Sequence, residues 1–283
     1  MTSETSESLD MVSFGEVFKG VLQQRGAESM PVAVKMTKKT ISEYLQQSFM
    51  KEMTIMSQMM HPNIVRLYGI VSEDVPSPWI VLEYMEHGDL KSFLTKNERS
   101  VQQMVKYMVD VAMGMHYISE RGLVHRDLAA RNVLVGANEI CKVADFGLLR
   151  AIPRDLSVYT ASHSIPSPIR WMPPESIIDR AFSAASDVWS FGVLVWEMFN
   201  PTKLPFEKYD NMAVVSNVNE GASATHPKRS PLYCGQDNEG LLAQEPQQTT
   251  ILPAHIYPPL HKNFLLNVVL SIERDVYTFT RCT

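Results

Sequence analysis

The sequence has no excess of positive charge and few cysteines. Lys and Arg total 26 against 31 Asp and Glu, a formal net charge of -5 at pH 7, so the chain lacks the basic field that draws proteins to nucleic acids or anionic membranes. We therefore expect no nucleic-acid partner. The three cysteines, Cys141, Cys234 and Cys282, are odd in number and far apart, which argues against a disulfide framework or a structural zinc site and favours a reducing, cytosolic setting.

Long hydrophobic runs are missing as well. No uninterrupted apolar stretch approaches the ~20 residues that a membrane-spanning helix needs, and the Ser-, Thr- and Glu-rich first ten residues lack the basic and apolar regions of a signal peptide. We therefore expect a cytoplasmic chain without a membrane segment. Its 283 residues, 45% of them hydrophobic and 20% charged, are typical of a globular protein long enough for two modest lobes or one large domain.

The first hundred residues predict mainly strands around one helix. Short apolar or β-branched runs at Val32–Lys35, Asn63–Val71 and Trp79–Leu82 favour strands. The segment Thr2–Ser8 is too polar to predict a further strand before them. An amphipathic helix is expected over residues 41–60, ending before His61-Pro62, because apolar residues recur there at steps of three and four: Leu45, Phe49, Met53, Met56 and Met60.

After Gly88 the pattern becomes helical. A long apolar stripe ends at Gly122 and consists of Met104, Met108, Val111, Met115 and Ile118. The segment Ser186–Phe199 is apolar on every side, which predicts a buried helix. We expect a small strand-rich lobe followed by a larger helical lobe. Residues 222–260 are rich in Pro, Gln, Ser and Thr without periodicity, which predicts loop or disorder.

Two charged residues in the strand-rich part suit the binding of nucleotide phosphates. The run Val32–Lys35 is a strand that ends in a lysine, and Glu52 follows on the apolar-flanked face of the predicted helix. Such a glutamate can hold the Lys35 ammonium toward the α- and β-phosphates. Taken alone, however, a lysine after a strand and a glutamate on a helix are usually solvated surface groups.

The segment 125–132, which reads His-Arg-Asp-Leu-Ala-Ala-Arg-Asn, is far more specific. Phosphoryl transfer needs a carboxylate that orients the attacking hydroxyl and divalent cations that hold the phosphates. In this motif Asp127 is the candidate base and Asn132 a candidate magnesium ligand. Residues 145–147 then read Asp-Phe-Gly, in which Asp145 supplies the main magnesium carboxylate.

These motifs resemble the catalytic domain of protein tyrosine kinases over roughly three quarters of the chain. Further marks are the segments 14–17, 61–65, 171–175 and 187–192, which read FGEV, HPNIV, WMPPE and DVWSFG. The resemblance implies an α+β, bilobal kinase-like fold with a strand-rich N-lobe containing one helix and an incomplete, mainly helical C-lobe. It also implies transfer of the ATP γ-phosphate to tyrosine in protein substrates. The run 85–94, MEHGDLKSFL, resembles insulin-receptor-like kinases, so the chain is either cytoplasmic or the intracellular part of a plasma-membrane receptor.

Tyrosine specificity is implied by two segments. Residues 129–131 read Ala-Ala-Arg, where serine/threonine kinases carry a lysine, and Arg131 therefore joins the catalytic candidates. The segment Pro168–Trp171 resembles the shelf on which family members rest the substrate tyrosine. Tyr159 matches the position of an activating phosphotyrosine, whose phosphate would pair with Arg126 and Arg150. Phosphotyrosine-binding adaptors are then candidate partners, beside ATP and the protein substrates.

The resemblance also assigns the nucleotide pocket. Leu82 matches the residue behind the adenine, and Met56, Leu67, His125 and Phe146 match a hydrophobic column that links the lobes. The alternative interpretation of these residues is plain core packing, and both interpretations can hold at once. The expected cofactors are ATP and Mg²⁺. The residues expected to bind ATP are Phe14 and Gly15 in the phosphate loop, Val17, Ala33 and Leu134 around the ring, Lys35 at the phosphates, and Glu83 and Met85 at the hinge.

Two departures from the family pattern open an alternative. The phosphate loop usually has three glycines, but Asp10 and Val12 stand at the first two of these positions. Beyond Gly221 the resemblance stops, and Glu175 should be buried without the arginine that family members supply. We therefore divide the chain into a polar segment 1–9, a kinase domain 10–221 with lobes at about 10–84 and 85–221, and a divergent tail 222–283. The alternative function is a truncated, weakly active or inactive kinase-like binding or decoy module.

Overall fold

The structure is a computed structural model, and it describes residues 6–12, 15–23, 26, 28–37, 53–71, 78–96, 98–152, 156–161 and 167–219. Of residues 6–12, 15, 37 and 219 it describes the backbone alone. Several features predicted from sequence therefore lie outside the described residues. They are Phe14, Glu52, most of the helix expected over residues 41–60, and the tail 222–283.

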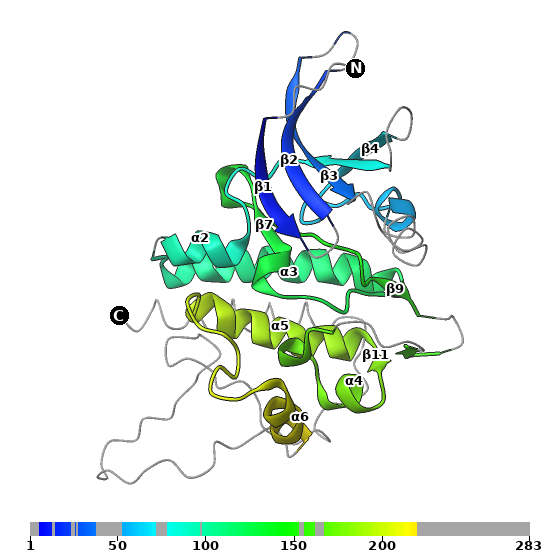
Figure 1. Cartoon of the computed structure of the whole chain (residues 1–283), viewed down its shortest axis with the longest axis vertical. Helices are drawn as coiled ribbons and strands as arrows, with labels where there is room; N and C mark the ends of the chain where they lie inside the picture. The colour runs from blue at the N-terminus through cyan, green and yellow to red at the C-terminus, as the bar shows by residue number, and fades with distance from the viewer. Residues whose placement is uncertain are drawn as a thin grey trace.

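The N-terminal lobe is built on a five-stranded antiparallel sheet of order β1-β2-β3-β5-β4. Figure 1 shows this sheet standing above the helices of the second lobe. The strands predicted at Val32–Lys35 and Trp79–Leu82 are confirmed within β3 and β5. The bounds of the five strands are β1 Ser6–Val12, β2 Gly15–Leu22, β3 Met30–Thr37, β4 Leu67–Val71 and β5 Trp79–Glu83.

The first strand corrects part of one expectation: the segment Thr2–Ser8 was judged too polar for a strand, yet Ser6–Ser8 belong to β1, while residues 2–5 lie outside the described residues. β1 pairs with β2 in an antiparallel register that sets Asp10 opposite Val17 and Val12 opposite Gly15. It lies at the edge of the sheet, hydrogen-bonded to β2 alone. Backbone hydrogen bonds hold such a strand whatever its side chains, and edge strands are often polar. Polarity was therefore a poor guide here.

Two other boundaries differ from expectation. Residues 53–56 are helical, but a turn follows at Ser57 and Gln58, so the helix ends earlier than predicted. Met53 and Met56 are buried as expected, whereas Met60 is 74% exposed. Its backbone N–H donates to Tyr117 Oη at 2.8 Å, which fixes the chain in a non-helical path. The predicted strand 63–71 begins only at Leu67.

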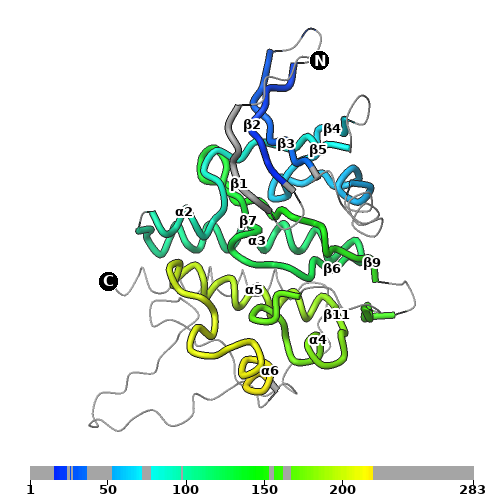
Figure 2. Tube along the Cα trace, viewed as in Figure 1, coloured from blue at the N-terminus to red at the C-terminus, as the bar shows by residue number. Residues whose placement is uncertain are grey.

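The C-terminal lobe is mainly helical, which confirms the two-lobed α+β architecture (Figures 1 and 2). Short strand pairs β6–β9, β7–β8 and β10–β11 lie among the helices. The helices are α2 Leu90–Lys96, α3 Val101–Glu120, η1 Ala130–Asn132, η2 Ala137–Glu139, η3 Ile169–Trp171, α4 Pro174–Ile178, α5 Ala184–Phe199 and α6 Asn211–Asn219. The strands are β6 Leu123–Val124, β7 Val133–Val135, β8 Cys141–Val143, β9 Arg150–Ala151, β10 Tyr159–Thr160 and β11 Ala181–Phe182.

Helix α3 forms the centre of the core. A capping box of Ser100 and Gln103 starts it, and this arrangement satisfies backbone N–H groups that the helix itself leaves unpaired. All five residues of the predicted stripe are buried. Gly114 is required because a Cβ atom there would lie 2.5 Å from the carbonyl oxygen of Asn63. The helix therefore packs directly against the loop that leads into β4.

Glu175 is the second correction, because its side chain is exposed rather than buried. It lies in the first turn of the short helix α4. A carboxylate in that position remains hydrated and interacts favourably with the positive end of the helix dipole. The cost expected for an unpaired buried charge therefore does not arise.

Candidate active site

Strand β3 brings Lys35 to the carboxylate that follows β8. Lys35 Nζ lies 3.5 Å from Asp145 Oδ1, and only 6% and 21% of the two side chains are exposed. The lysine charge holds the pKa of Asp145 below its usual range, against the opposing effect of burial. Asp145 is therefore ionised, and it has a positive φ of 57° that turns the chain between β8 and Phe146. The expected partner Glu52 lies outside the described residues.

The segment between β6 and β7 presents Asp127 and Asn132 on one loop. Asn132 Nδ2 donates to the backbone oxygen of Asp127 at 2.7 Å, which closes the loop on itself. The Arg131 guanidinium donates to Asp127 Oδ1. Burial raises the pKa of Asp127 to about 6, although the Arg131 charge lowers it. Asp127 is thus a carboxylate of raised basicity that Arg131 holds in one orientation.

Asp187 of α5 holds the loop through two hydrogen bonds to its backbone. Its carboxylate accepts the backbone N–H groups of His125 at 2.8 Å and of Arg126 at 3.0 Å. Arg126 has φ of 72°, an unfavourable conformation for a side-chain-bearing residue, which these bonds stabilise. The sequence motif 187–192 contains Asp187 but does not indicate this role. The available signal was that Asp187 is one of two carboxylates in an otherwise apolar helix.

His125 connects the loop to the segment after β8. Burial lowers its pKa, so the ring is neutral. Its Nε2 lies 3.1 Å from the Ala144 carbonyl and its Nδ1 accepts the backbone N–H of Asp127, an arrangement that fits a proton on Nε2. The ring also meets Phe146 edge to face at 5.4 Å. Met56 and Phe146 belong to one buried cluster with Leu67 packed against it, so the predicted hydrophobic column is assembled.

The residues expected around adenine lie on β2, β3, the hinge and β7. Ala33 pairs with Leu82 across the sheet, and Val17 pairs with Lys35. Met85 is buried in a cluster against which Leu82 and Leu134 pack. Gly15 begins β2, while Phe14 lies outside the described residues. Of the described members of the predicted nucleotide pocket, Gly15, Val17, Ala33 and Lys35 therefore lie on the adjacent strands β2 and β3, and Met85 and Leu134 lie in one cluster with Leu82.

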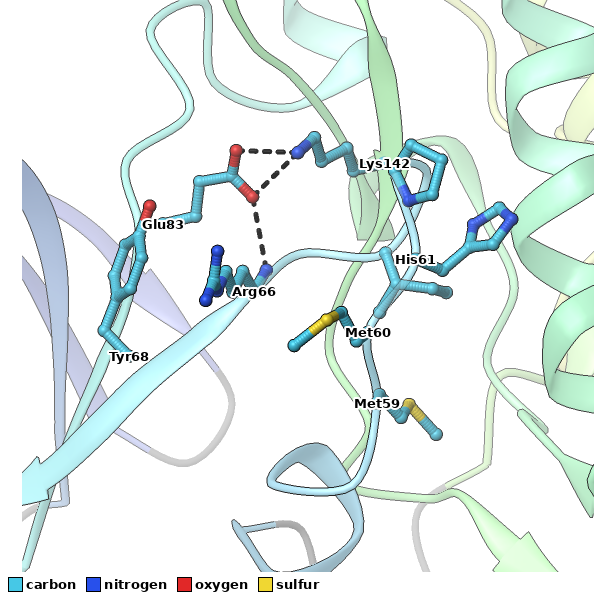
Figure 3. A pocket seen from close by; sticks show the side chains of 9 residues that line it. Met59, Met60, His61, Arg66, Tyr68, Glu83 and Lys142 are labelled. Atoms are coloured by element: carbon cyan, nitrogen blue, oxygen red, sulfur yellow. Dashed lines mark hydrogen bonds and ion pairs between the residues drawn. The ribbon is translucent and has the colours of Figure 1, made fainter.

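The side chain of Glu83 has a separate partner. Its carboxylate accepts Lys142 Nζ at 2.7 and 2.9 Å and the backbone N–H of Arg66 at 3.2 Å. Figure 3 shows these contacts at the wall of a cavity of about 290 Å³ that Tyr68 also lines. The Glu83 carboxylate is therefore occupied, and the backbone N–H of Glu83 donates to the Arg66 carbonyl at 2.9 Å; the nucleotide contact expected of Glu83 stays a prediction.

Tyr159 lies in β10 beside Arg126. The Arg126 guanidinium carbon lies 5.1 Å from the Tyr159 ring centre and 4.2 Å from that of Phe182. Arg150, the other expected phosphate partner, instead donates to the carbonyls of Gly147 and Leu149. The structure therefore brings Arg126, but not the Arg150 guanidinium, to the tyrosine.

Hard oxygen donors are available for a divalent cation. Asp145 is ionised, and the amide nitrogen of Asn132 is used as a donor, so the amide oxygen is the atom suited to a metal. One carboxylate and one amide oxygen, completed by substrate phosphates, fit the coordination that Mg²⁺ prefers. Among the described residues no cluster of three or more His, Cys, Asp or Glu forms a separate metal site.

This combination of fold and site defines a protein kinase. Residues 3–236 match the model of the family described as protein tyrosine and serine/threonine kinase, and the chain belongs to that family, whose members use ATP and a divalent metal ion. The chain is 42% identical over 220 residues to ephrin type-A receptor 5 of Gallus gallus, a match that covers 77% of this chain and 22% of the receptor.

Two further relatives agree. Ephrin type-A receptor 8 of Rattus norvegicus is 43% identical over 219 residues, 77% of this chain and 59% of that sequence. Ephrin type-B receptor 1 of Gallus gallus is 42% identical over 222 residues, which cover 77% of this chain and 22% of the receptor. The chain thus spans about a fifth of most of these receptors. The matches support the receptor tyrosine kinase class without singling out the insulin-receptor-like kinases expected from sequence.

None of the described helices combines the length and the apolar character needed to cross a membrane.

Proposed function

We propose that this chain transfers the γ-phosphate of ATP to tyrosine in protein substrates and uses Mg²⁺ to do so. The observation that carries the proposal is the arrangement around Asp127. Its carboxylate has a raised pKa, Arg131 holds it, and the Lys35–Asp145 pair completes the site. This set suits a base that faces a hydroxyl beside a clamp for phosphates.

Each residue then has a distinct task. Asp127 orients the substrate hydroxyl and takes its proton, Lys35 holds the nucleotide phosphates, and Asp145 with Asn132 holds Mg²⁺. The bound ion neutralises the charge that develops on the phosphates. The new bond joins the tyrosine oxygen to the γ-phosphorus, the bond between that phosphorus and the β–γ bridging oxygen breaks, and ADP leaves.

Tyrosine specificity is proposed from the neighbours of Asp127. Residues 129–131 read Ala-Ala-Arg in the segment where serine/threonine kinases carry a lysine, and the Arg131 guanidinium lies 4.3 Å from the ring centre of Trp171. The segment Pro168–Trp171 then forms the substrate shelf. We assign residues 10–221 to the kinase domain. By analogy with the receptors it resembles, we place the chain on the cytoplasmic side of a plasma membrane, with phosphotyrosine-binding adaptors as partners.

The alternative, a kinase-like binding module without activity, is not favoured, because Lys35, Asp127, Asn132 and Asp145 are all present. A thermal melt titrated with ATP, with and without Mg²⁺, tests the nucleotide part of the proposal. We expect stabilisation that increases with ATP and needs Mg²⁺, since a ligand that binds only the folded state raises stability. A melt that ATP and Mg²⁺ leave unchanged would favour the inactive module.

A further inference from the structure

One buried carboxylate has no part in the chemistry described so far. Glu197, near the end of α5, is 1% exposed. Its Oε2 accepts the backbone N–H of Ala130 at 2.9 Å and the indole N–H of Trp171 at 2.8 Å. Its Oε1 has a distant ion-pair partner in Lys91 Nζ at 4.0 Å and no hydrogen bond within the described part of the chain. Burying a carboxylate is costly unless its partners compensate, so the two groups that Glu197 binds matter for the fold.

Glu197 connects the catalytic loop with the substrate shelf. Ala130 belongs to the loop that carries Asp127, and Trp171 ends the shelf. A single oxygen atom receives one hydrogen bond from each segment. Two N–H donors that share an acceptor are held within a few ångströms of each other, so the loop and the shelf cannot shift independently.

The same two segments meet again at the reacting groups. The Trp171 ring faces the Arg131 guanidinium at 4.3 Å, and Arg131 in turn donates to Asp127 Oδ1. Contacts therefore run without a gap from Glu197 through Trp171 and Arg131 to Asp127. An indole turned away from Glu197 would remove the face against which Arg131 lies.

The backbone of the shelf is held by a second contact, so the orientation of the Trp171 ring can be changed without detaching the shelf from α5. Ser190 Oγ donates to the carbonyl oxygen of Trp171 at 2.8 Å. This bond is independent of Glu197 and fixes the Trp171 main chain on α5. Loss of the Glu197 carboxylate should therefore free the indole ring and the Ala130 amide while the shelf stays attached.

We propose that Glu197 is a positioning residue that couples the substrate shelf to the catalytic loop. Its carboxylate fixes the Trp171 indole and the Ala130 amide together, and through Arg131 it sets the orientation of Asp127. The inference rests on the proposed tyrosine kinase activity. It assigns to Glu197 an effect on phosphate transfer to the peptide, without a direct contact to ATP or to the substrate.

Three variants separate this role from simple stability. Glu197→Gln keeps an oxygen acceptor of the same reach and removes the charge, whereas Glu197→Met keeps the length and removes the acceptor. Trp171→Phe leaves an aromatic face for Arg131 but no N–H for Glu197. Each is compared with wild type in steady-state kinetics on a tyrosine peptide, in ATP binding and in hydrogen exchange of the peptide that contains Ala130.

We expect Glu197→Met to lower kcat on the peptide about tenfold or more, as small misplacements of reacting groups do, with the ATP dissociation constant within about twofold of wild type. Glu197→Gln should restore most of the turnover. Trp171→Phe should also lower kcat, and the double variant Trp171→Phe/Glu197→Met should be no worse than the poorer single variant. Exchange at Ala130 should be faster in Glu197→Met.

Additive losses in the double variant, or unchanged kcat in Trp171→Phe, would overturn the proposal. If Glu197→Met does not fold, the other two variants decide. A normal kcat in Trp171→Phe, or a kcat close to zero in Glu197→Gln, contradicts the role. Wild-type chain that phosphorylates no tyrosine would overturn the proposed function. The exchange comparison would still test whether Glu197 holds the loop.

Discussion

The buried carboxylate of Asp187 accepts the backbone N–H of Arg126 at 3.0 Å, at the residue where the catalytic loop takes a positive φ of 72°. The bond joins the apolar helix α5 to a residue of the loop that has a left-handed backbone conformation. Its second acceptor oxygen takes the N–H of His125. Asp127, the next residue along, therefore follows two backbone groups that α5 holds in place.

This relationship predicts the effect of Asp187→Asn. An amide offers one acceptor oxygen instead of two, so one of the two backbone N–H groups loses its partner. We expect a loss of about 1–3 kcal/mol in the free energy of unfolding together with a large loss of peptide phosphorylation. Denaturant unfolding and a peptide assay measure both. Asp179→Asn, a change at an exposed residue that ends α4, is the control and should alter neither.

Tyr159→Phe tests the regulatory part of the account. A phosphate on Tyr159 would add about -1.5 to -2 charges near the Arg126 guanidinium and order the loop. We expect mass spectrometry to find phosphate on Tyr159 after incubation with ATP and Mg²⁺, and Tyr159→Phe to lower peptide phosphorylation. Tyr209→Phe, at a tyrosine that is 45% exposed, serves as the matched control. Phosphate found only at other tyrosines would count against the assignment.

The replacement of two glycines by Asp10 and Val12 in the phosphate loop predicts weakened ATP binding. β1 and β2 form the hairpin that carries Asp10 opposite Val17 and Val12 opposite Gly15. An acidic side chain repels triphosphate oxygens, and glycine would let the backbone approach them. Asp10→Gly with Val12→Gly should therefore tighten ATP binding several-fold in a titration. Ser8→Gly, in the same strand, controls for added backbone freedom, and an affinity that stays the same in the double variant would remove the repulsion argument.

His61 predicts a pH dependence of stability. Burial, together with the charges of Arg121 and His116, lowers its pKa, and its Nδ1 accepts the backbone N–H of Asn63 at 3.1 Å. The unfolded chain therefore binds the proton more readily, so stability falls as pH drops through ~6.5 and below.

The matching substitution is His61→Asn, which keeps an acceptor and cannot be protonated. The drop in melting temperature from about pH 7.5 to about pH 5.5 should be smaller in this variant, by about a degree or two because the ring is partly exposed. His87→Asn, at an exposed histidine, is the control. Equal drops in wild type and His61→Asn would show that His61 takes up no proton on unfolding.

Helix α3 and the central strands could be predicted from sequence because their signal is periodic and local. The five-residue stripe of α3 is buried in full, since burial follows directly from apolar spacing. β1 could not be predicted in this way, because its pairing depends on the neighbouring strand rather than on its own side chains. Met60 was misplaced because its backbone is held by Tyr117, a contact that only the fold creates.

The site shows the same division. Asp127, Asn132 and Asp145 were found because they stand in dense motifs, and the structure brings them to one region with Lys35. The contacts of Asp187 and Glu197 could not be predicted, because these are the two carboxylates of the apolar helix α5 and their partners lie on segments far away in the sequence. Sequence shows that such a residue is unusual in its surroundings; only the tertiary structure shows what it binds.

The most direct test of the central claim is phosphate transfer from ATP and Mg²⁺ to matched peptides that differ only in carrying tyrosine, phenylalanine or serine, with wild type beside Asp127→Asn and Lys35→Met. Wild type should label the tyrosine peptide alone. Asp127→Asn should abolish transfer with ATP binding nearly intact, because Asp127 addresses the hydroxyl and not the nucleotide. Lys35→Met should impair the positioning of the phosphates, and it should lower turnover more than it weakens ATP binding. Full transfer by either variant, or labelling of serine in place of tyrosine by wild type, would contradict the account.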